Sequence, residues 1–263
     1  MTALAAVADG VLVATHEFCT TTTTVVLGED GGCLVVDPAV TPAEIDALAA
    51  ELAALGRRVT ASFSTHPHWD HLLWRDALGE APRWATAAGA RAARERQAEN
   101  RQKALAALPG LDVSGLGRVT AVPEGAATLP WAGPRVEVLE HRAHAPGHAA
   151  LLVPDAGVLV AGDMLSDIEI PLPDTAAADP LGDYDRALDL FAAALSRVDV
   201  VVPGHGSAGD RAALRRRIAA DRRYLADVRA GRPVEDPRLS GGPDWLQREH
   251  AELLSIVGRV RDR

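Results

Sequence analysis

Short runs of β-branched and apolar residues, separated by turn residues, dominate the first part of the chain. They occupy 11–15, 21–28, 33–37 and 59–65, and Gly31-Gly32 lies between the second and the third. Runs of this length and composition are typical of β-strands. We therefore expect four strands in this part of the chain.

A helix is expected between the third and the fourth of these strands. The sequence Thr41-Pro42-Ala43-Glu44 matches a capping box with proline at the first helical position. Apolar residues then recur at helical spacing, and Gly56 is suited to end the helix. These apolar residues are Ile45, Leu48, Leu52 and Leu55.

The second half of the chain has a similar order of elements. Apolar runs at 135–141, 149–153 and 157–163 precede a helical pattern near 183–195 and a further strand pattern at 199–206. Strands followed by a helix, twice and without regular alternation, predict an α/β (α+β) fold of two packed sheets flanked by helices.

Three further segments have helical patterns. Residues 86–107 are very polar, which fits either a solvated face or a wall over a pocket. Two more helices are expected near the end of the chain, the second at 245–260, with a link rich in proline and glycine between them. We therefore predict a main domain at 1–207 and a C-terminal helical extension at 208–263 packed on it.

Charge and hydropathy narrow the choice of partners. The chain has 263 residues and a formal net charge of −9, and a strongly acidic chain repels nucleic-acid phosphates. No apolar run approaches the roughly 18 residues that a membrane helix needs. We therefore expect a small-molecule substrate and neither nucleic acid nor a membrane as partner. Residues 1–18 lack the basic segment of a signal peptide, so we expect a cytoplasmic protein. The sequence leaves open whether the protein forms a homodimer.

The segment Thr65-His66-Pro67-His68-Trp69-Asp70-His71 holds three of the nine histidines. In an extended backbone residues i and i+2 point the same way, so His66 and His68 project together. Imidazole and carboxylate groups suit zinc, iron, manganese or cobalt. Four such groups in one loop exceed what a single open catalytic metal takes from one segment, which favours two adjacent metal ions.

Further ligands are expected where three later strands end beside glycine or proline. The sequences Ala-Pro-Gly-His, Val-Ala-Gly-Asp and Val-Pro-Gly-His carry His148, Asp163 and His205. Glycine lets the backbone turn sharply there and bring the side chain inward.

This set of residues resembles the metallo-β-lactamase-fold superfamily over roughly residues 10 to 207. The resemblance implies an αββα sandwich with two metal ions in a cleft at one edge of the sheets. It assigns three groups of residues. The first metal would take His66, His68 and His148, the second Asp70, His71 and His205, and Asp163 would bridge both. Asp37 would steady the ligand loop from behind, and we place His144 behind the ligands as well.

Within the superfamily the pattern is most similar to the glyoxalase II, lactonase and thioesterase-like branch. We expect a dinuclear zinc hydrolase that cleaves a carboxylic ester, thioester or lactone with a metal-bridging hydroxide, which Asp70 helps to orient. Iron or manganese is the alternative to zinc. The alternative functions are a mononuclear iron persulfide dioxygenase and a catalytically inactive binding protein. The substrate itself stays open.

An apolar rim is the last expectation. The segment after Asp163 mixes apolar residues with prolines and leaves a strand that would end at the metals. It is either a plain connection or part of a surface that holds an acyl group. We favour a substrate rim made of Trp69, Met164, Leu165, Ile168 and Ile170.

Overall fold

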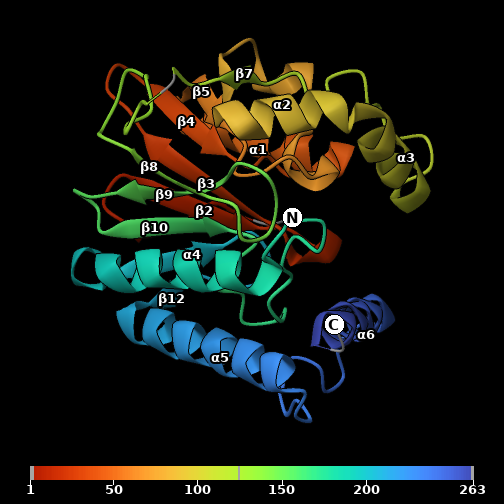
Figure 1. Cartoon of the computed structure of the whole chain (residues 1–263). Coiled ribbons are helices and arrows are strands. Elements are labelled where there is room, and N and C mark those ends of the chain that lie inside the picture. The colour runs from red at the N-terminus through yellow and green to blue at the C-terminus, as the bar shows by residue number, and fades with distance from the viewer. Residues whose placement is uncertain (1–2, 124, 262–263) are drawn as a thin grey trace.

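The computed structural model describes residues 3–123 and 125–261. Two β-sheets pack face to face, and helices cover the outer face of each (Figure 1). The predicted αββα sandwich of two mixed sheets with C-terminal helices is thereby confirmed. Among the described residues, no helix is both long and apolar enough to cross a membrane.

The first sheet has seven strands, and their order in the sheet follows the chain. The strands from β1 to β4 are antiparallel neighbours, and β4 to β7 are parallel. The parallel pairing brings the carboxyl ends of β4 and β5 to the same edge. The strands are β1 (Ala5–Ala8), β2 (Val11–Thr15), β3 (Thr22–Leu27), β4 (Gly32–Val36), β5 (Arg58–Phe63), β6 (Arg83–Ala85) and β7 (Thr120–Ala121).

The second sheet has five strands in the order β12-β11-β10-β9-β8. Its strands are antiparallel except for the pair β10 and β11. The strands are β8 (Glu137–His141), β9 (His148–Val153), β10 (Val158–Gly162), β11 (Val200–Pro203) and β12 (Gly209–Asp210). A bridge between Thr21 and His205, and a bond from the Thr22 amide to the Gly204 carbonyl, join the two sheets at one corner.

Helices α1 (Pro42–Ala54), α2 (Ala87–Glu95) and α3 (Gln97–Ala107) cover the first sheet (Figure 1). The capping box of α1 forms as expected: Thr41 Oγ1 accepts from the Glu44 amide at 3.3 Å, and Glu44 Oε2 accepts from the Thr41 amide at 3.0 Å. The polar segment expected as one helix is two, because Arg96 leaves helical geometry at φ −96° and ψ 13°.

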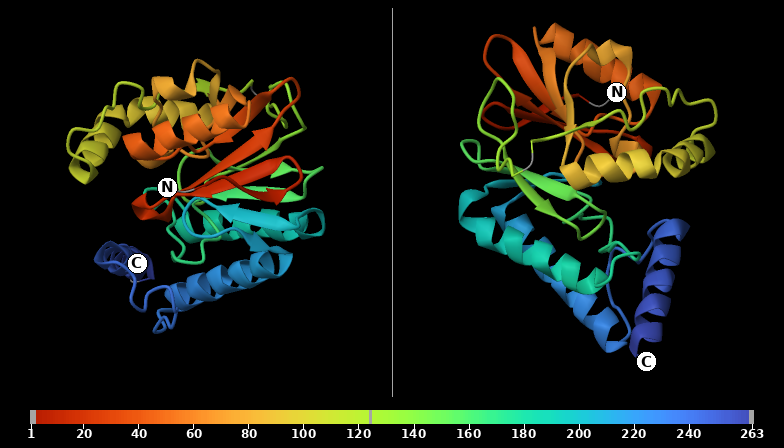
Figure 2. Two further views of the ribbon diagram at one scale, coloured as in Figure 1. Left: turned by 180° about the vertical axis from the view of Figure 1, so that it is seen from behind. Right: turned by 45° about the horizontal axis from the view of Figure 1, so that its top comes forward.

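Helices α4 (Pro180–Ala194), α5 (Arg211–Ala230) and α6 (Asp244–Arg261) lie on the side of the second sheet. Helix α5 lies along α4, while α6 follows a loop at the end of α5 and runs in another direction (Figure 2). Both C-terminal helices contribute side chains to the apolar core beneath that sheet, among them Leu214, Leu225, Leu246 and Leu253. Short 3-10 turns lie at Phe18–Thr20, Trp69–His71, Asp76–Leu78 and Leu195–Arg197.

Candidate metal centre

The loop after β5 carries the histidine-rich segment, and Asp37 holds it from behind. Asp37 directly follows β4 and lies at φ 49°, so the chain turns and directs its carboxylate under the neighbouring loop. Its Oδ1 accepts from the Thr65 amide at 2.8 Å, and its Oδ2 accepts from the Thr65 hydroxyl at 2.6 Å. The parallel pairing of β4 and β5 therefore fixes where the segment begins.

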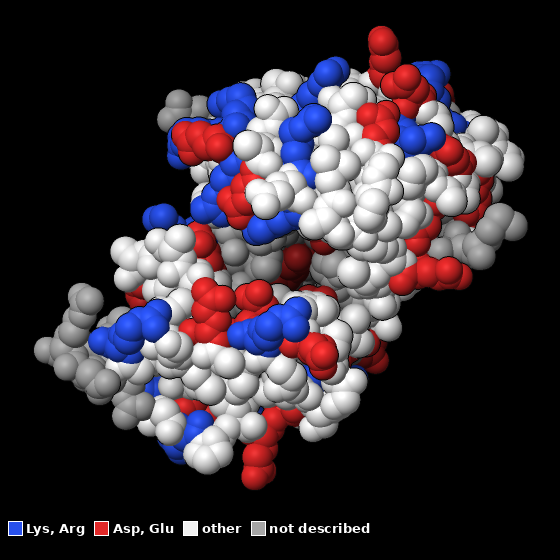
Figure 3. Space-filling model, turned by 90° about the vertical axis from the view of Figure 1, so that its right-hand side faces the viewer, with Lys and Arg blue, Asp and Glu red and all other residues white. Residues whose placement is uncertain are grey.

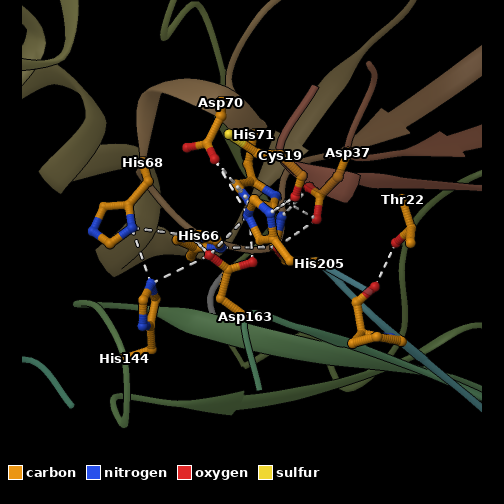
Figure 4. Close-up of polar contacts among 12 residues, drawn as sticks. Cys19, Thr22, Asp37, His66, His68, Asp70, His71, His144, Asp163 and His205 are labelled. Atoms are coloured by element: carbon orange, nitrogen blue, oxygen red, sulfur yellow. Dashed lines mark hydrogen bonds and ion pairs between the residues drawn. The ribbon is translucent and has the colours of Figure 1, made fainter. Parts of the chain in front are cut away.

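One group of side chains, which we call the first cluster, is rich in imidazole. It consists of His66, His68, His144 and Asp163, whose ligand-type atoms lie within 4.8 Å of one another (Figure 4). His68 Nδ1 lies 3.1 Å from His66 Nε2 and 3.0 Å from His144 Nε2. His66 Nε2 is also 3.4 Å from Asp163 Oδ2.

A second cluster lies directly beside the first. It consists of Asp70, His71 and His205, again within 4.8 Å. His205 Nε2 is 3.4 Å from His71 Nε2 and 3.3 Å from Asp70 Oδ2 (Figure 4). His205 follows β11, so the second sheet supplies this side chain to the loop of the first.

Asp163 lies between the clusters and touches both. Its Oδ1 is 3.1 Å from His71 Nε2, and its Oδ2 is 3.5 Å from both His144 Nε2 and His205 Nε2. The neighbouring Gly204 makes this position possible, since a Cβ there would come within 2.1 Å of Asp163 Oδ1.

The outward nitrogen of four histidines faces an oxygen. His144 Nδ1 lies 2.7 Å from the Leu172 carbonyl, and His205 Nδ1 lies 2.8 Å from the Cys19 carbonyl. His66 Nδ1 lies 3.0 Å from the Thr65 hydroxyl, and His71 Nδ1 lies 3.0 Å from Asp37. Such partners fix the tautomer and leave the inner lone pairs free for a metal.

In the first cluster the inner nitrogens of His66, His68 and His144 converge on one another. Neutral imidazoles whose outer nitrogen carries the proton cannot hydrogen-bond to one another through two lone pairs. Buried acceptors left without donors are costly. The donor set fits a pair of transition-metal ions, which accept such lone pairs.

The pKa values of the histidines are shifted in opposite directions in the two clusters. In the first, burial lowers the pKa of His68 well below its ordinary value and that of His144 to about 4. In the second, burial acts the same way, but Asp163 and the nearby carboxylates outweigh it and raise the pKa of His71 and of His205 well above the ordinary value. Burial opposes ionisation of Asp70, yet His71 and His205 lower its pKa.

The geometry places His144, and not His148, in the first cluster, while the sequence-based assignment of His148 as a metal ligand stays a prediction. His148 is the first residue of β9 and pairs with His141, so the strand fixes its direction. Its ring packs on His66 and His141, both its nitrogens are buried without a hydrogen-bond partner, and it is not part of either cluster. His144 lies in the loop before the strand, which lets its ring reach the cleft.

Three of the five residues expected in an apolar rim are buried in the core. Directly after Asp163 the chain turns tightly, with Leu165 at φ 59°, and the next side chains enter the core beneath the second sheet. Buried there are Met164, Leu165 and Ile170. Ile168 is 39% exposed. Trp69 is half-buried and packs edge-on against Phe18, with ring centroids 5.9 Å apart.

Three contacts at the centre were not foreseen. Asn100 of α3 is buried, and its Nδ2 donates to the Pro67 carbonyl at 2.9 Å, which ties the polar helix to the ligand loop. Glu169 Oε1 lies 3.8 Å from His205 Nδ1, and burial raises the pKa of Glu169 to about 7. Arg238 of the C-terminal segment donates to the Glu169 carbonyl at 3.0 Å. No pattern of residues along the chain signals these contacts, since each joins distant segments.

The protein is an αββα sandwich with two adjoining His/Asp clusters at one edge, and a shared carboxylate joins the clusters. This combination defines a metal-dependent hydrolase with a binuclear site. The family model described as the metallo-β-lactamase superfamily matches residues 17–205. The chain therefore belongs to the metallo-β-lactamase superfamily.

Solved structures show the same fold. A metallo-β-lactamase family protein from Thermus thermophilus is 27% identical with a TM-score of 0.63, over 86% of this chain and 82% of that one. A metallo-β-lactamase from Pontibacter korlensis is 19% identical with a TM-score of 0.62, over 83% and 98%. A β-lactamase domain protein from Burkholderia ambifaria is 21% identical with a TM-score of 0.60, over 87% and 78%. None of the curated proteins matches this chain.

Proposed function

We propose that this protein is a dinuclear zinc hydrolase of the glyoxalase II, lactonase and thioesterase-like branch, acting on a carboxylic ester, thioester or lactone. The observation that carries the proposal is the position of Asp163, whose carboxylate lies within 3.5 Å of histidines from both clusters. A carboxylate shared in this way suits two ions held side by side. The first cluster would hold one zinc ion through His66, His68 and His144, and the second the other through Asp70, His71 and His205.

Two zinc ions in this site would supply a hydroxide at neutral pH and polarise the scissile carbonyl. The chain's own groups would orient the reaction. Asp70 is the most exposed of the site's carboxylates, with 16% of its side chain accessible, so it is placed to orient the attacking water. Thr65, Asp37 and the Leu172 and Cys19 carbonyls would keep the histidines in place during turnover.

The second cluster favours hydrolysis over the alternative of a mononuclear iron persulfide dioxygenase. A single iron would need only two histidines and one carboxylate, which the first cluster supplies by itself. With a single iron in the first cluster, no metal ion would bind to Asp70, His71 and His205. Asp37 and the Cys19 carbonyl nevertheless hold the two histidines in a fixed orientation.

The test is a hydrolase screen with the metal-loaded protein. Zinc-loaded protein would be assayed on esters, thioesters, lactones and β-lactams, and persulfide consumption with oxygen uptake would be measured on iron-loaded protein. The proposal expects zinc-dependent cleavage of at least one carbonyl substrate, abolished in Asp163→Ala. Oxygen uptake by the iron form, without hydrolysis by the zinc form, would refute it.

A further inference from the structure

The segment between α5 and α6 reaches the metal centre, although it lies far from the ligands in the sequence. Helix α6 lies on the face of the molecule that is hollowed (Figure 3). Residues 231–243 join α5 to α6, and Arg238 in this segment contacts the loop that follows Asp163. A route of direct contacts therefore leads from the C-terminal helices toward the second cluster.

His205, a member of the second cluster, lies between two glycines. Ordering a glycine costs more backbone freedom than ordering any other residue. Close contacts nevertheless require both of them. A Cβ at Gly204 would come within 2.1 Å of Asp163 Oδ1, and one at Gly206, which is at φ 114°, within 2.2 Å of Asp167 Oδ1. The backbone of His205 must therefore be held in place by bonds from other segments.

The loop after Asp163 supplies two of these bonds. Ser166 is buried, and its Oγ donates to the His205 carbonyl at 2.8 Å. The same oxygen accepts from two amides of its own loop, which fixes its position. Asp167 Oδ1 accepts from the Ser207 amide at 2.8 Å. The loop thus holds the chain on both sides of Gly206.

Arg238 in turn holds this loop. Its Nη1 donates to the main-chain carbonyls of Glu169 at 3.0 Å and of Ser166 at 3.3 Å. The same nitrogen donates to Asp221 of α5 at 2.7 Å, while Nε and Nη2 donate to the two oxygens of Asp236 at 2.9 and 2.7 Å. A bidentate pair with a carboxylate fixes the plane of a guanidinium. The Arg238 side chain is only 7% exposed, so its direction is set by these partners.

The contacts of Arg238 exceed what its charge requires. Asp221 and Asp236 already balance the guanidinium, and the two carbonyls are further acceptors from a single turn of the loop. A planar group with donors in a fixed fork can bind both carbonyls only when the loop has this shape. Arg238 therefore favours the loop conformation in which Ser166 reaches His205.

We propose that Arg238 and Ser166 are positioning residues that hold His205 in place for the second cluster. Arg238 fixes the loop after Asp163, and Ser166 bonds that loop to the His205 backbone. Both act through His205 and not on the substrate, so this role goes beyond the proposed hydrolase function.

Two conservative variants interrupt these contacts at different points. Ser166→Ala removes the hydroxyl that donates to His205. Arg238→Lys keeps a positive charge beside its two aspartates but loses the planar fork. Leu253→Ala is the control for lost stability, because Leu253 is buried in the core beneath the second sheet and takes no part in these contacts. The melting temperature of each variant verifies that it folds.

The first measurement is hydrogen exchange in the metal-free protein. The Ser207 amide donates to Asp167, and the Gly206 amide donates to the Thr20 carbonyl at 2.9 Å. Relative to the strands of the second sheet, both amides should lose protection in Ser166→Ala and in Arg238→Lys but not in Leu253→Ala. Unchanged protection of both amides in the two folded variants would overturn the positioning role.

The second measurement is the cobalt affinity of each site. Ser166→Ala and Arg238→Lys should each weaken the second site by about 10–100-fold and the first far less. The double variant should be no weaker than the worse single variant, because both changes interrupt one route. Losses that multiply in the double variant, or that Leu253→Ala reproduces, would contradict the proposal.

The two measurements separate this proposal from the hydrolase function. A wild-type protein that binds one cobalt ion per chain would contradict the dinuclear hydrolase, while lost protection at Gly206 and Ser207 in the variants would still support the positioning of His205. Two cobalt ions per chain, with unchanged protection and affinity in both variants, would leave the hydrolase intact and contradict the positioning role.

Discussion

The two clusters are built from similar residues but stand in opposite electrostatic surroundings. The first gathers three imidazoles around one carboxylate oxygen, and burial lowers the pKa of His68 and His144. The second gathers two imidazoles among carboxylates, with Asp37 behind His71, and the pKa of its histidines is raised. The first cluster is therefore ready to bind a cation as neutral ligands, while the second must release protons to do so.

This contrast shows that the two metal sites of one binuclear centre can differ in how strongly protons compete with the metal ion for the histidines. Metal binding at a histidine requires the deprotonated ring. The shared Asp163 couples the sites, since its two oxygens face different histidines. Changes at Asp163 should therefore affect both sites, and changes elsewhere should affect mainly one.

The largest effect is expected from Asp163→Ala, which removes the carboxylate between the clusters. Changes behind metal ligands typically cost about 10–100-fold, so the loss of a shared ligand should lower kcat/KM by more than about 100-fold. Metal content should fall at both sites. Elemental analysis, together with kcat/KM on one substrate, checks this. A variant that keeps two metals per chain would contradict the role of Asp163 as a ligand shared by both sites.

The next largest effect separates His144 from His148. His144→Ala should remove the metal of the first cluster and reduce kcat/KM by at least about 100-fold, because a ligand is lost. His148→Asn should keep two metals and mainly lower the melting temperature, because that ring packs in the core. The two variants assayed side by side for metal content decide the assignment. The reverse outcome would restore His148 as the ligand.

A smaller effect, strongest at the second cluster, is expected from Asp37→Asn. The amide would keep the position behind His71 but would no longer supply a negative charge to it. Affinity at the second site should fall about 10–100-fold, with the first site much less affected. Cobalt titration monitored by absorption spectroscopy resolves the two sites. Equal weakening of both would contradict a separate role for Asp37.

The mildest perturbation is a change of pH. His71 and His205 have raised pKa values, so in the metal-free protein they hold protons at neutral pH that a metal must displace. As pH falls, affinity at the second cluster should drop by about tenfold per pH unit for each proton released. The pKa of His144 is about 4 and that of His68 is also low, so these two ligands of the first cluster should compete with protons only in more acidic solution. Metal titrations at several pH values check whether the second cluster loses its metal ion at a higher pH than the first.

The fold and most of the centre could be predicted because the signals are local. The spacing of His66, His68, Asp70 and His71 fixes four side chains within one loop, and the strand pattern places Asp163 and His205 at strand ends. The choice between His144 and His148 could not be made in this way. They lie on either side of Ala145-Pro146-Gly147, and only the folded structure shows that His144 joins the first cluster while His148 begins β9.

The remaining differences arise from tertiary contacts. The turn at Leu165 sends three predicted rim residues into the core, and no glycine there announces a positive φ. The bond from Asn100 to Pro67 joins residues 33 positions apart, and that from Arg238 to Glu169 joins residues 69 positions apart. Neither bond leaves a local pattern in the sequence, because each forms only once the chain is folded.

The central claim, two metal ions held by two joined clusters, is tested most directly by elemental analysis of protein purified without chelator. The account predicts about two transition-metal ions per chain, with zinc the major element. One iron per chain and no zinc would contradict it.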